Sequence, residues 1–324
     1  MRWVRFVCFS ACLIFAGRTA LARGAGDFAA QGPGGPGGGR AAIVEQATSA
    51  IQSGHADAAE ALTRQGLQRW PRDPQLLHLL GLAEFRLNKL EPAARDLTKA
   101  QQVAPGDAGI SFDLGLVDMT LRQYDAAARQ FERVLGVRNH DHPALTHILL
   151  GRAYQNSNRT RPAIEQFSAA LRLDPSVALG HYHLGFAYES VGESAKALGE
   201  LRLEASRTRD NPEVFYQYGH MLAETGSWEL AVSELRRALE LNPEHGDALY
   251  DMGKSLLLLG RVAEAVAALR HSVEVAPDSV NGHYQLARAL AKSGDREGAK
   301  TEMERFATLK KMRGQSGASA TGLR

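Results

Sequence analysis

Residues 144–177 decide the fold of the chain and read ALTHILLGRAYQNSNRTRPAIEQFSAALRLDPSV. The Leu150-Gly151 pair recurs at steps of 34 residues, with one step of 36, as Leu80-Gly81, Leu114-Gly115, Leu184-Gly185, Tyr218-Gly219, Met252-Gly253 and finally Leu286-Ala287. An alanine follows twelve residues after the small residue in every copy, at Ala59, Ala93, Ala127, Ala163, Ala197, Ala231, Ala265 and Ala299. A fixed period of this length indicates an array of repeated supersecondary units.

Each copy has the pattern of two antiparallel helices. Gly151 and Ala163 carry little or no side chain, so two helix backbones can approach closely where they cross. In the second half of the copy, Ala163, Phe167 and Ala170 follow a helical spacing that gives one apolar stripe. A single pair of helices leaves that stripe uncovered, so we expect neighbouring pairs to stack.

Turn-forming residues separate these predicted helices. The link inside each copy carries a residue type that accepts a left-handed conformation, at Gly54, Asn88, Asn158, Gly192, Gly226, Gly260 and Gly294, and only Arg122 departs. Proline ends five of the copies, at Pro71, Pro105, Pro175, Pro243 and Pro277. Because proline cannot continue an α-helix, it is expected to end the second helix.

This pattern resembles the tetratricopeptide repeat, and residues 144–177 match its signature best, through Leu150, Gly151, Tyr154, Ala163, Phe167, Ala170 and Pro175. The resemblance implies an all-α, right-handed α-solenoid of about eight helix-turn-helix repeats, with a concave groove lined mainly by the first helix of each repeat. It covers residues 40–313, in units 40–73, 74–107, 108–141, 144–177, 178–211, 212–245, 246–279 and 280–313. The resemblance implies a fold and leaves the activity open.

Two departures from the pattern lie in the later units. Glu204 occupies a place that usually holds a small apolar residue, and we expect it at a frayed or exposed helix end. The eighth unit ends at Lys310 and Lys311 without a proline, and its second helix is expected to cap the array.

The N-terminal residues 1–22 have the layout of a secretory signal peptide. Arg2 and Arg5 precede an apolar run at 6–16, and Ala20-Leu21-Ala22 forms a small-x-small cleavage site. The sequence therefore predicts export to the periplasm or out of the cell. A membrane anchor through an uncleaved signal or a lipid at Cys12 is the alternative, and an organellar presequence also remains open.

The two segments flanking the repeats are poor in apolar side chains. Residues 23–39 are rich in Gly and Pro and are predicted to form a flexible linker, and residues 314–324 are predicted to form a disordered tail. Both cysteines, Cys8 and Cys12, lie in the signal, so the mature chain would hold no disulfide or cysteine-based metal site.

Charge and motifs restrict the function classes. The chain has 38 Lys and Arg residues against 36 Asp and Glu residues, and the signal segment holds three of the arginines and no acid. A nearly neutral mature chain is not expected to bind nucleic acid. Since no phosphate loop, dinucleotide fingerprint, nucleophile elbow or zinc-protease motif is present, the sequence predicts neither an enzyme nor a cofactor. A metal site in the loop with His140, Asp141, His142 and His147 is the weaker alternative.

The candidate binding site is the predicted groove. The resemblance implies that the fifth place of each unit faces it, and this place holds Phe112 in the third unit and then Tyr182, Tyr216, Tyr250 and Tyr284. Four places on, one helical turn along the same face, lie Arg152, Lys254 and Arg288. The tyrosines suit either ligand binding or packing between units. This mixture predicts a protein or peptide ligand with apolar and acidic segments.

We therefore expect a non-catalytic scaffold or adaptor that binds partners in its groove. An accessory or regulatory subunit of an enzyme, or of an export or assembly complex, is the alternative.

Overall fold

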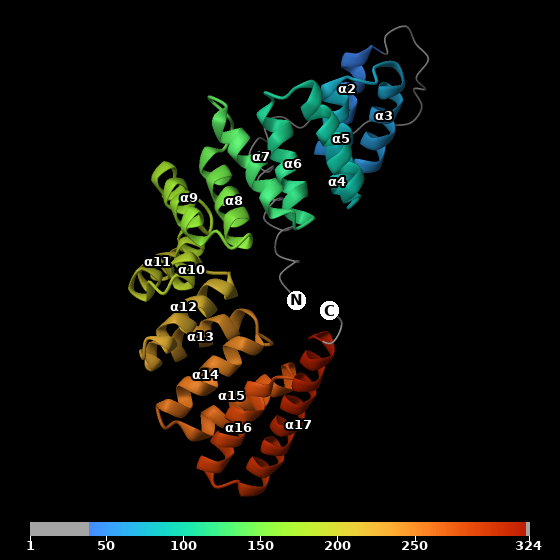
Figure 1. Ribbon diagram of the computed structural model, residues 1–324. Coiled ribbons are helices and arrows are strands. Elements are labelled where there is room, and N and C mark those ends of the chain that lie inside the picture. Colours follow the sequence, from blue (N-terminus) through green and yellow to red (C-terminus); the bar gives the residue numbers. More distant parts are fainter. Residues whose placement is uncertain (1–38, 322–324) are drawn as a thin grey trace. The chain divides into compact units, whose positions relative to one another are not determined.

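The computed structural model describes residues 39–321, with side chains through Arg313. Every regular element in this range is a helix, and within each of the two compact units of the chain successive helices run antiparallel to one another (Figure 1). The predicted signal peptide and all of the predicted linker except Gly39 lie outside the described residues. The chain divides into two compact units, residues 1–159 and 160–324.

The first unit contains seven helices in its described part. They are α2 (Arg40–Gln52), α3 (Ala56–Arg69), α4 (Pro74–Arg86), α5 (Leu90–Val103), α6 (Ala108–Thr120), α7 (Tyr124–Gly136) and α8 (Pro143–Asn156). Each helix packs against the next, and the first helices α2, α4 and α6 of successive hairpins also contact one another.

The second unit contains nine helices in its described part. They are α9 (Thr160–Leu173), α10 (Gly180–Ser190), α11 (Ser194–Arg207), α12 (Pro212–Glu224), α13 (Trp228–Leu241), α14 (Gly246–Leu258), α15 (Val262–Val275), α16 (Val280–Ser293) and α17 (Arg296–Thr321). As in the first unit, each helix packs against the next, and α14 contacts both α12 and α16.

Within each unit, the small residues of the repeat hold the two helices of a hairpin close together. A Cβ atom on Gly81 of α4 would lie 2.5 Å from Cγ of Leu97 in α5, and one on Gly253 of α14 would lie 2.5 Å from Cγ of Leu269 in α15. The marker alanines from Ala59 to Ala265 are fully buried. The predicted reason for the small residues, close approach of two backbones, is confirmed.

The turns also follow the sequence prediction. The residue linking the two helices of each hairpin has a positive φ, and this includes Arg122 at 62°. An arginine pays a steric cost in this conformation that glycine avoids, so the fold imposes the turn at this position. The prolines at the ends of the units all lie between helices.

Two expectations about helix ends were wrong. Glu204 is buried rather than exposed, and its Oε2 accepts a hydrogen bond of 3.2 Å from the backbone N–H of Tyr182 near the start of α10. It thereby satisfies a donor at a helix start that has no side-chain cap of its own. Residues 314–321, predicted to be disordered, continue α17 as helix because no proline stops it.

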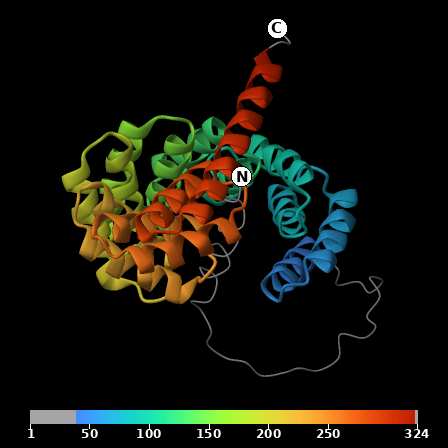
Figure 2. The same ribbon diagram turned by 90° about the horizontal axis from the view of Figure 1, so that it is seen from below.

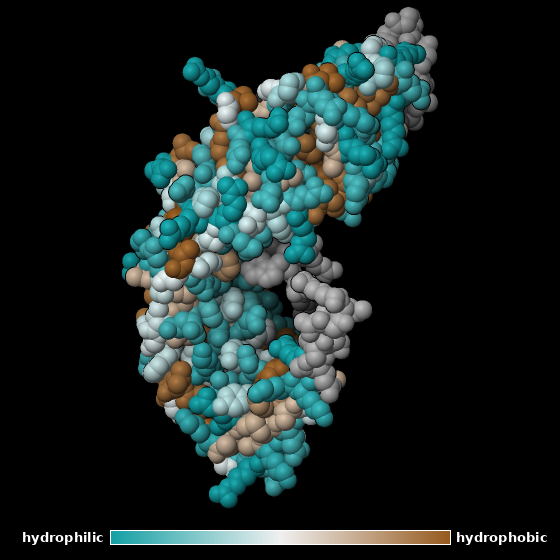
Figure 3. Space-filling view, in the orientation of Figure 1, coloured by the Kyte–Doolittle hydropathy of each residue, from teal (hydrophilic) through white to brown (hydrophobic). Residues whose placement is uncertain are grey.

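The visible surface is mostly polar. On the face shown in Figure 3, hydrophobic residues form separate patches among hydrophilic ones. None of the described helices is long and apolar enough to cross a lipid bilayer.

Candidate functional site

In the second unit, the tyrosines of the repeat lie on the first helices of successive hairpins. We call the surface formed by α10, α12, α14 and α16 the first-helix face. Tyr182 on α10 is buried, Tyr216 on α12 and Tyr250 on α14 are half-buried, and Tyr284 on α16 is 39% exposed. Tyr182 therefore packs inside the unit, whereas the other three tyrosines retain accessible surface.

A network of polar side chains joins three of these helices. His220 of α12 lies between two carboxylates, with its Nδ1 2.7 Å from Oδ2 of Asp251 on α14 and its Nε2 3.7 Å from Oε1 of Glu189 on α10. Gln217 of α12 donates a hydrogen bond to the same Glu189. Two of these contacts join α12 to α10 and one joins α12 to α14, so the network fixes the spacing of the three first helices.

This network shifts the pKa values of its members. The hydrogen bond that His220 donates to Asp251 raises the pKa of His220 above its usual value, although burial opposes the shift. Burial raises the pKa of Glu189, which favours its neutral form. A charged His220 is therefore the form that the two neighbouring carboxylates stabilise.

The middle of the first-helix face is more acidic than the sequence indicated. Burial raises the pKa of Tyr216, and the nearby carboxylates of Asp251, Asp247, Glu213 and Glu189 raise it further. The Tyr216 ring also lies 4.5 Å from the ring of His245, measured between centroids. Tyr216 consequently stays a neutral hydrogen-bonding hydroxyl in an acidic setting.

The two predicted cations of this unit differ in their surroundings. Lys254 Nζ on α14 forms an ion pair of 2.9 Å with Oε1 of Glu224 on α12, which raises the pKa of Lys254 and lowers that of Glu224. Arg288 on α16 is exposed, its guanidinium donates a hydrogen bond of 3.1 Å to Gln285, and it lies 5.9 Å from the ring centroid of Tyr284. Arg288 is thus the more accessible of the two charges.

The remaining predicted site residues belong to the first unit. Phe112 on α6 is half-buried and meets Phe131 of α7 edge-to-face, at 6.0 Å between ring centroids. Arg152 on α8 is half-buried. Between α4 and α6, Nε2 of His78 lies 2.6 Å from Oδ2 of Asp113. The structure therefore places two predicted residues in the first unit and six in the second.

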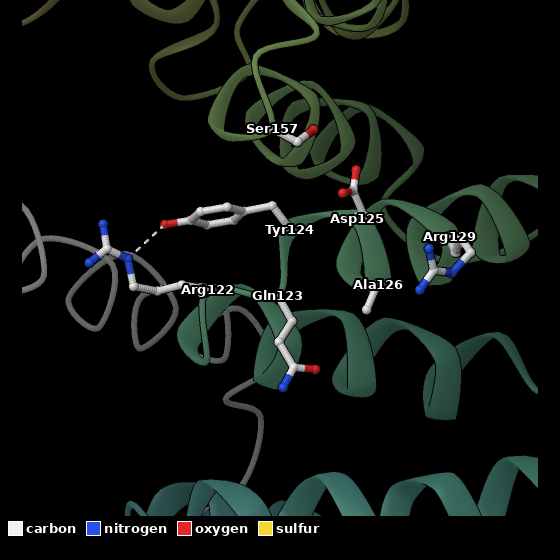
Figure 4. A pocket seen from close by; sticks show the side chains of 7 residues that line it. All are labelled: Arg122, Gln123, Tyr124, Asp125, Ala126, Arg129 and Ser157. Atoms are coloured by element: carbon white, nitrogen blue, oxygen red, sulfur yellow. Dashed lines mark hydrogen bonds between the residues drawn. The ribbon is translucent and has the colours of Figure 1, made fainter. Parts of the chain in front are cut away.

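A shallow depression in the first unit lies at the turn between α6 and α7. It has a volume of about 460 Å³ and is lined by Arg122, Gln123, Tyr124, Asp125, Ala126, Arg129 and Ser157 (Figure 4). Nε of Arg122 donates a hydrogen bond of 3.2 Å to the hydroxyl of Tyr124. The lining includes Ser157 and no histidine.

Of the four residues considered for a metal site, His140, Asp141 and His142 lie in the loop between α7 and α8, and His147 lies on α8. Within residues 39–313, no group of three or more His, Cys, Asp or Glu side chains is arranged to hold a metal ion. Nδ1 of His140 instead lies 2.9 Å from the carbonyl oxygen of Val137, and His142 adopts a positive φ of 55° at the start of α8.

Sequence reasoning missed the polar side chains that join successive first helices. Asp251 directly follows Tyr250, Gln217 directly follows Tyr216, and Asp113 directly follows Phe112. All three side chains reach back to the preceding first helix, to His220, Glu189 and His78 respectively. The available signal was a polar residue in the sixth place of a unit, together with a titratable residue about one repeat earlier that could pair with it.

The fold and this face define an all-α repeat protein of the solenoid class. The sequence matches the description "Tetratricopeptide repeat" at residues 44–108 and 148–212, and that of the "Cilia and flagella-associated protein 70 middle TPR-like domain" at residues 181–310. The chain belongs to the tetratricopeptide-repeat family. No curated protein sequence matches it.

Solved structures show the same fold at low sequence identity. A chain of the APC/C hetero-tetramer Cut9-Hcn1 has a TM-score of 0.58 and 16% identity over 76% of this chain and 48% of its own length. The C-terminal part of a TPR repeat-containing protein from Cytophaga hutchinsonii has a TM-score of 0.58 and 17% identity, over 71% of this chain and 93% of that one. A tetratricopeptide repeat protein from Parabacteroides merdae has a TM-score of 0.56 and 14% identity, over 78% of this chain and 98% of its own length.

Proposed function

We propose that this protein is an exported, non-catalytic scaffold that binds a protein or peptide on its first-helix face. The proposal rests above all on the row of Tyr216, Tyr250 and Tyr284, which occupy one register on adjacent helices and remain partly accessible. Tyrosine combines a large apolar ring with a hydroxyl at low entropic cost, which suits it to interfaces.

The network beneath the tyrosines supports the same function. Its bonds hold α10, α12 and α14 at fixed distances before any ligand arrives. A preformed surface loses less conformational entropy on binding than one that must become ordered. The half-buried polar groups therefore position the tyrosines and need not contact the ligand themselves.

The ligand combines an apolar segment with an acidic one. The apolar segment packs on the tyrosines, and the acidic segment meets Arg288, which is exposed on α16. Lys254 contributes less because Glu224 already neutralises it. Arg152 and Phe112 supply equivalent groups in the first unit.

Photocrosslinking in the native cell tests the position of the partner. A photoreactive phenylalanine analogue replaces Tyr250 or Tyr284 in the full chain, and the matched control carries it at Leu230, which is 60% exposed on the second helix α13. The proposal expects a discrete crosslinked protein from the two tyrosine positions and none from Leu230. Crosslinks from Leu230 alone would contradict it.

Charge reversal then tests the ligand chemistry with the captured partner. Arg152→Glu, Lys254→Glu and Arg288→Glu together are expected to weaken binding about tenfold or more, because each places like charges against the acidic segment. Arg288→Glu alone is expected to account for most of the loss. Unchanged affinity of the triple variant would reject an acidic segment.

Export is tested separately. Sequencing of the protein's N-terminus after fractionation is expected to find a mature chain that starts at Arg23 in the periplasm or medium. Recovery of the intact chain in the cytoplasm would refute export without affecting the binding site.

A further inference from the structure

The last described helix, α17, leaves uncovered a surface that is buried in earlier hairpins. In the second unit, the first helix of the next hairpin packs on α11, α13 and α15. Leu201, Leu235 and Leu269 occupy one repeat position on these helices and are fully buried. Met303 occupies the same position on α17 and is 41% exposed.

Part of this exposure comes from within the hairpin. In hairpins such as α14 and α15, the leucine fits over a glycine, because a Cβ at Gly253 would lie 2.5 Å from Leu269. The residue facing Met303 in the repeat pattern is Ala287 rather than glycine. Its methyl group occupies the space that a glycine would leave free for the longer side chain.

The exposed surface of α17 carries a basic stripe with an apolar centre, bordered on one side by the exposed carboxylates of Glu297 and Glu304. Arg296, Lys300, Met303, Ala307, Lys310 and Lys311 are all exposed, and at about 100° of rotation per residue they share one side of the helix. We call this set the α17 stripe. Among the described residues, none of its four cations forms an ion pair, although Lys310 lies 5.6 Å from the ring centroid of Phe306.

The geometry of the fold indicates what shape of partner fits this surface. On α11, α13 and α15, the corresponding side is occupied by the helices α12, α14 and α16. Figure 1 shows α17 beside α16 at the end of this series, and Figure 2 shows its C-terminal part extending beyond the neighbouring helices. A single additional helix could therefore pack on α17 as α12, α14 and α16 pack on the preceding second helices.

The charges disfavour two occupants that this chain could supply. A symmetric pairing of two copies through the stripe would place four cations opposite four cations, which is repulsive. Residues 1–38 contain four arginines and a single acid, Asp27, so they cannot neutralise the stripe. The complementary occupant is a foreign helix with carboxylates on either side of an apolar seam.

We propose that the α17 stripe docks an acidic amphipathic helix of a partner protein, in the place where the first helix of a further hairpin would lie. This site is separate from the first-helix face and does not depend on it. Apolar side chains of the partner cover Met303 and Ala307, and its carboxylates pair with Arg296, Lys300, Lys310 and Lys311.

The test measures binding of a fluorescein-labelled synthetic helix made of Glu, Ala and Leu to the full chain by fluorescence anisotropy. One control peptide carries Lys in place of every Glu, and the other carries Ser in place of every Leu. The acidic amphipathic peptide is expected to bind about tenfold or more tighter than either control, because both the charge and the apolar seam contribute.

Variants of the chain then locate the binding. Lys300→Glu, Lys310→Glu and Lys311→Glu together are expected to lower the affinity about tenfold or more. The matched control reverses Arg69, Arg95 and Arg133, three exposed arginines on α3, α5 and α7, which changes the net charge equally. Met303→Ser, at an exposed position, is expected to weaken binding without affecting the fold.

Four results would overturn the proposal. They are absence of peptide binding, equal losses in the stripe and control variants, binding of phosphatidylserine vesicles through the stripe without binding of the peptide, and a dimer in sedimentation equilibrium that the stripe variant abolishes. The third would assign the stripe to a membrane surface, and the fourth would assign it to a second copy.

Discussion

The hairpin α14–α15 and the hairpin α16–α17 follow one sequence pattern, but side chains at equivalent positions are buried to different extents. In the first, Gly253 and Leu269 meet at the helix crossing and the leucine is fully buried. In the second, Ala287 replaces the glycine, Met303 replaces the leucine, and the methionine is 41% exposed. Whether a repeat position is buried therefore depends on the glycine that faces it in the same hairpin and on the hairpin that packs next to it. The sequence of one repeat does not contain this information.

The hairpins also differ in how their first helices are joined to the preceding one. His220–Asp251 and Glu224–Lys254 tie α14 to α12. Between α14 and α16, the described side chains form no hydrogen bond or ion pair. The polar contact of α16 is made instead within its own hairpin, where Nδ1 of His283 lies 2.5 Å from Oε2 of Glu302 on α17.

The largest expected contrast comes from truncating the equivalent side chains. Leu269→Ala is expected to lower the free energy of unfolding by about 2–5 kcal/mol, because it leaves a cavity at a fully buried site. Met303→Ala is expected to cost less than about 1 kcal/mol, since much of that side chain is already in water. Urea unfolding followed by circular dichroism measures both, and equal losses would contradict the difference in burial.

Filling the glycine at the helix crossing gives the next largest effect. Gly253→Leu is expected to destabilise the protein by about 1–3 kcal/mol, because the added side chain must displace Leu269. Gly199→Leu is the matched control, since nothing lies within 4 Å of a Cβ built at this helical glycine of α11. Thermal unfolding is expected to show that the control variant is as stable as the original protein or slightly more stable. A similar loss of stability in both variants would contradict the idea that Gly253 is needed for the close approach of the two helices.

The smallest effect concerns the pH dependence of the ties between first helices. Folding raises the pKa of His220, so its contribution to stability is present below about 6.5 and is lost as the pH rises through the raised value. His220→Gln should reduce the decline in stability between pH 6 and pH 9 by about 0.5–1.5 kcal/mol. His271→Gln, on α15, serves as the control, and an unchanged decline in the His220 variant would show that the network does not stabilise the fold.

Much of the fold could be predicted because the repeat period fixes which residues face each other. The close approach at the glycines, the buried alanines and the turns with positive φ all followed from small residues at regular spacing. Glu204 was assigned wrongly because its hydrogen bond to Tyr182 joins two helices, and spacing within one helix does not contain that information. The extension of α17 was missed because small polar residues do not exclude a helix.

The sequence predicted which residues share the first-helix face, but it did not predict the charges around them. The tyrosine register identified the helices that form the face, yet it did not distinguish the buried Tyr182 from the exposed Tyr284. The acidic partners of His220 and Lys254 come from neighbouring hairpins, so counting charges in one place of each repeat overlooked them. Electrostatic properties of a stacked array arise between repeats and require the stacking to be known.

The central claim is that packing between neighbouring hairpins creates the core and leaves the outer side of α17 exposed to solvent. Hydrogen exchange of the intact protein, measured for each helix, tests this claim most directly. The account predicts that backbone amides of α15 exchange much more slowly than those of residues 296–309 in α17, because among the described helices a following helix packs on α15 and none packs on α17. Equal protection of the two helices would contradict it.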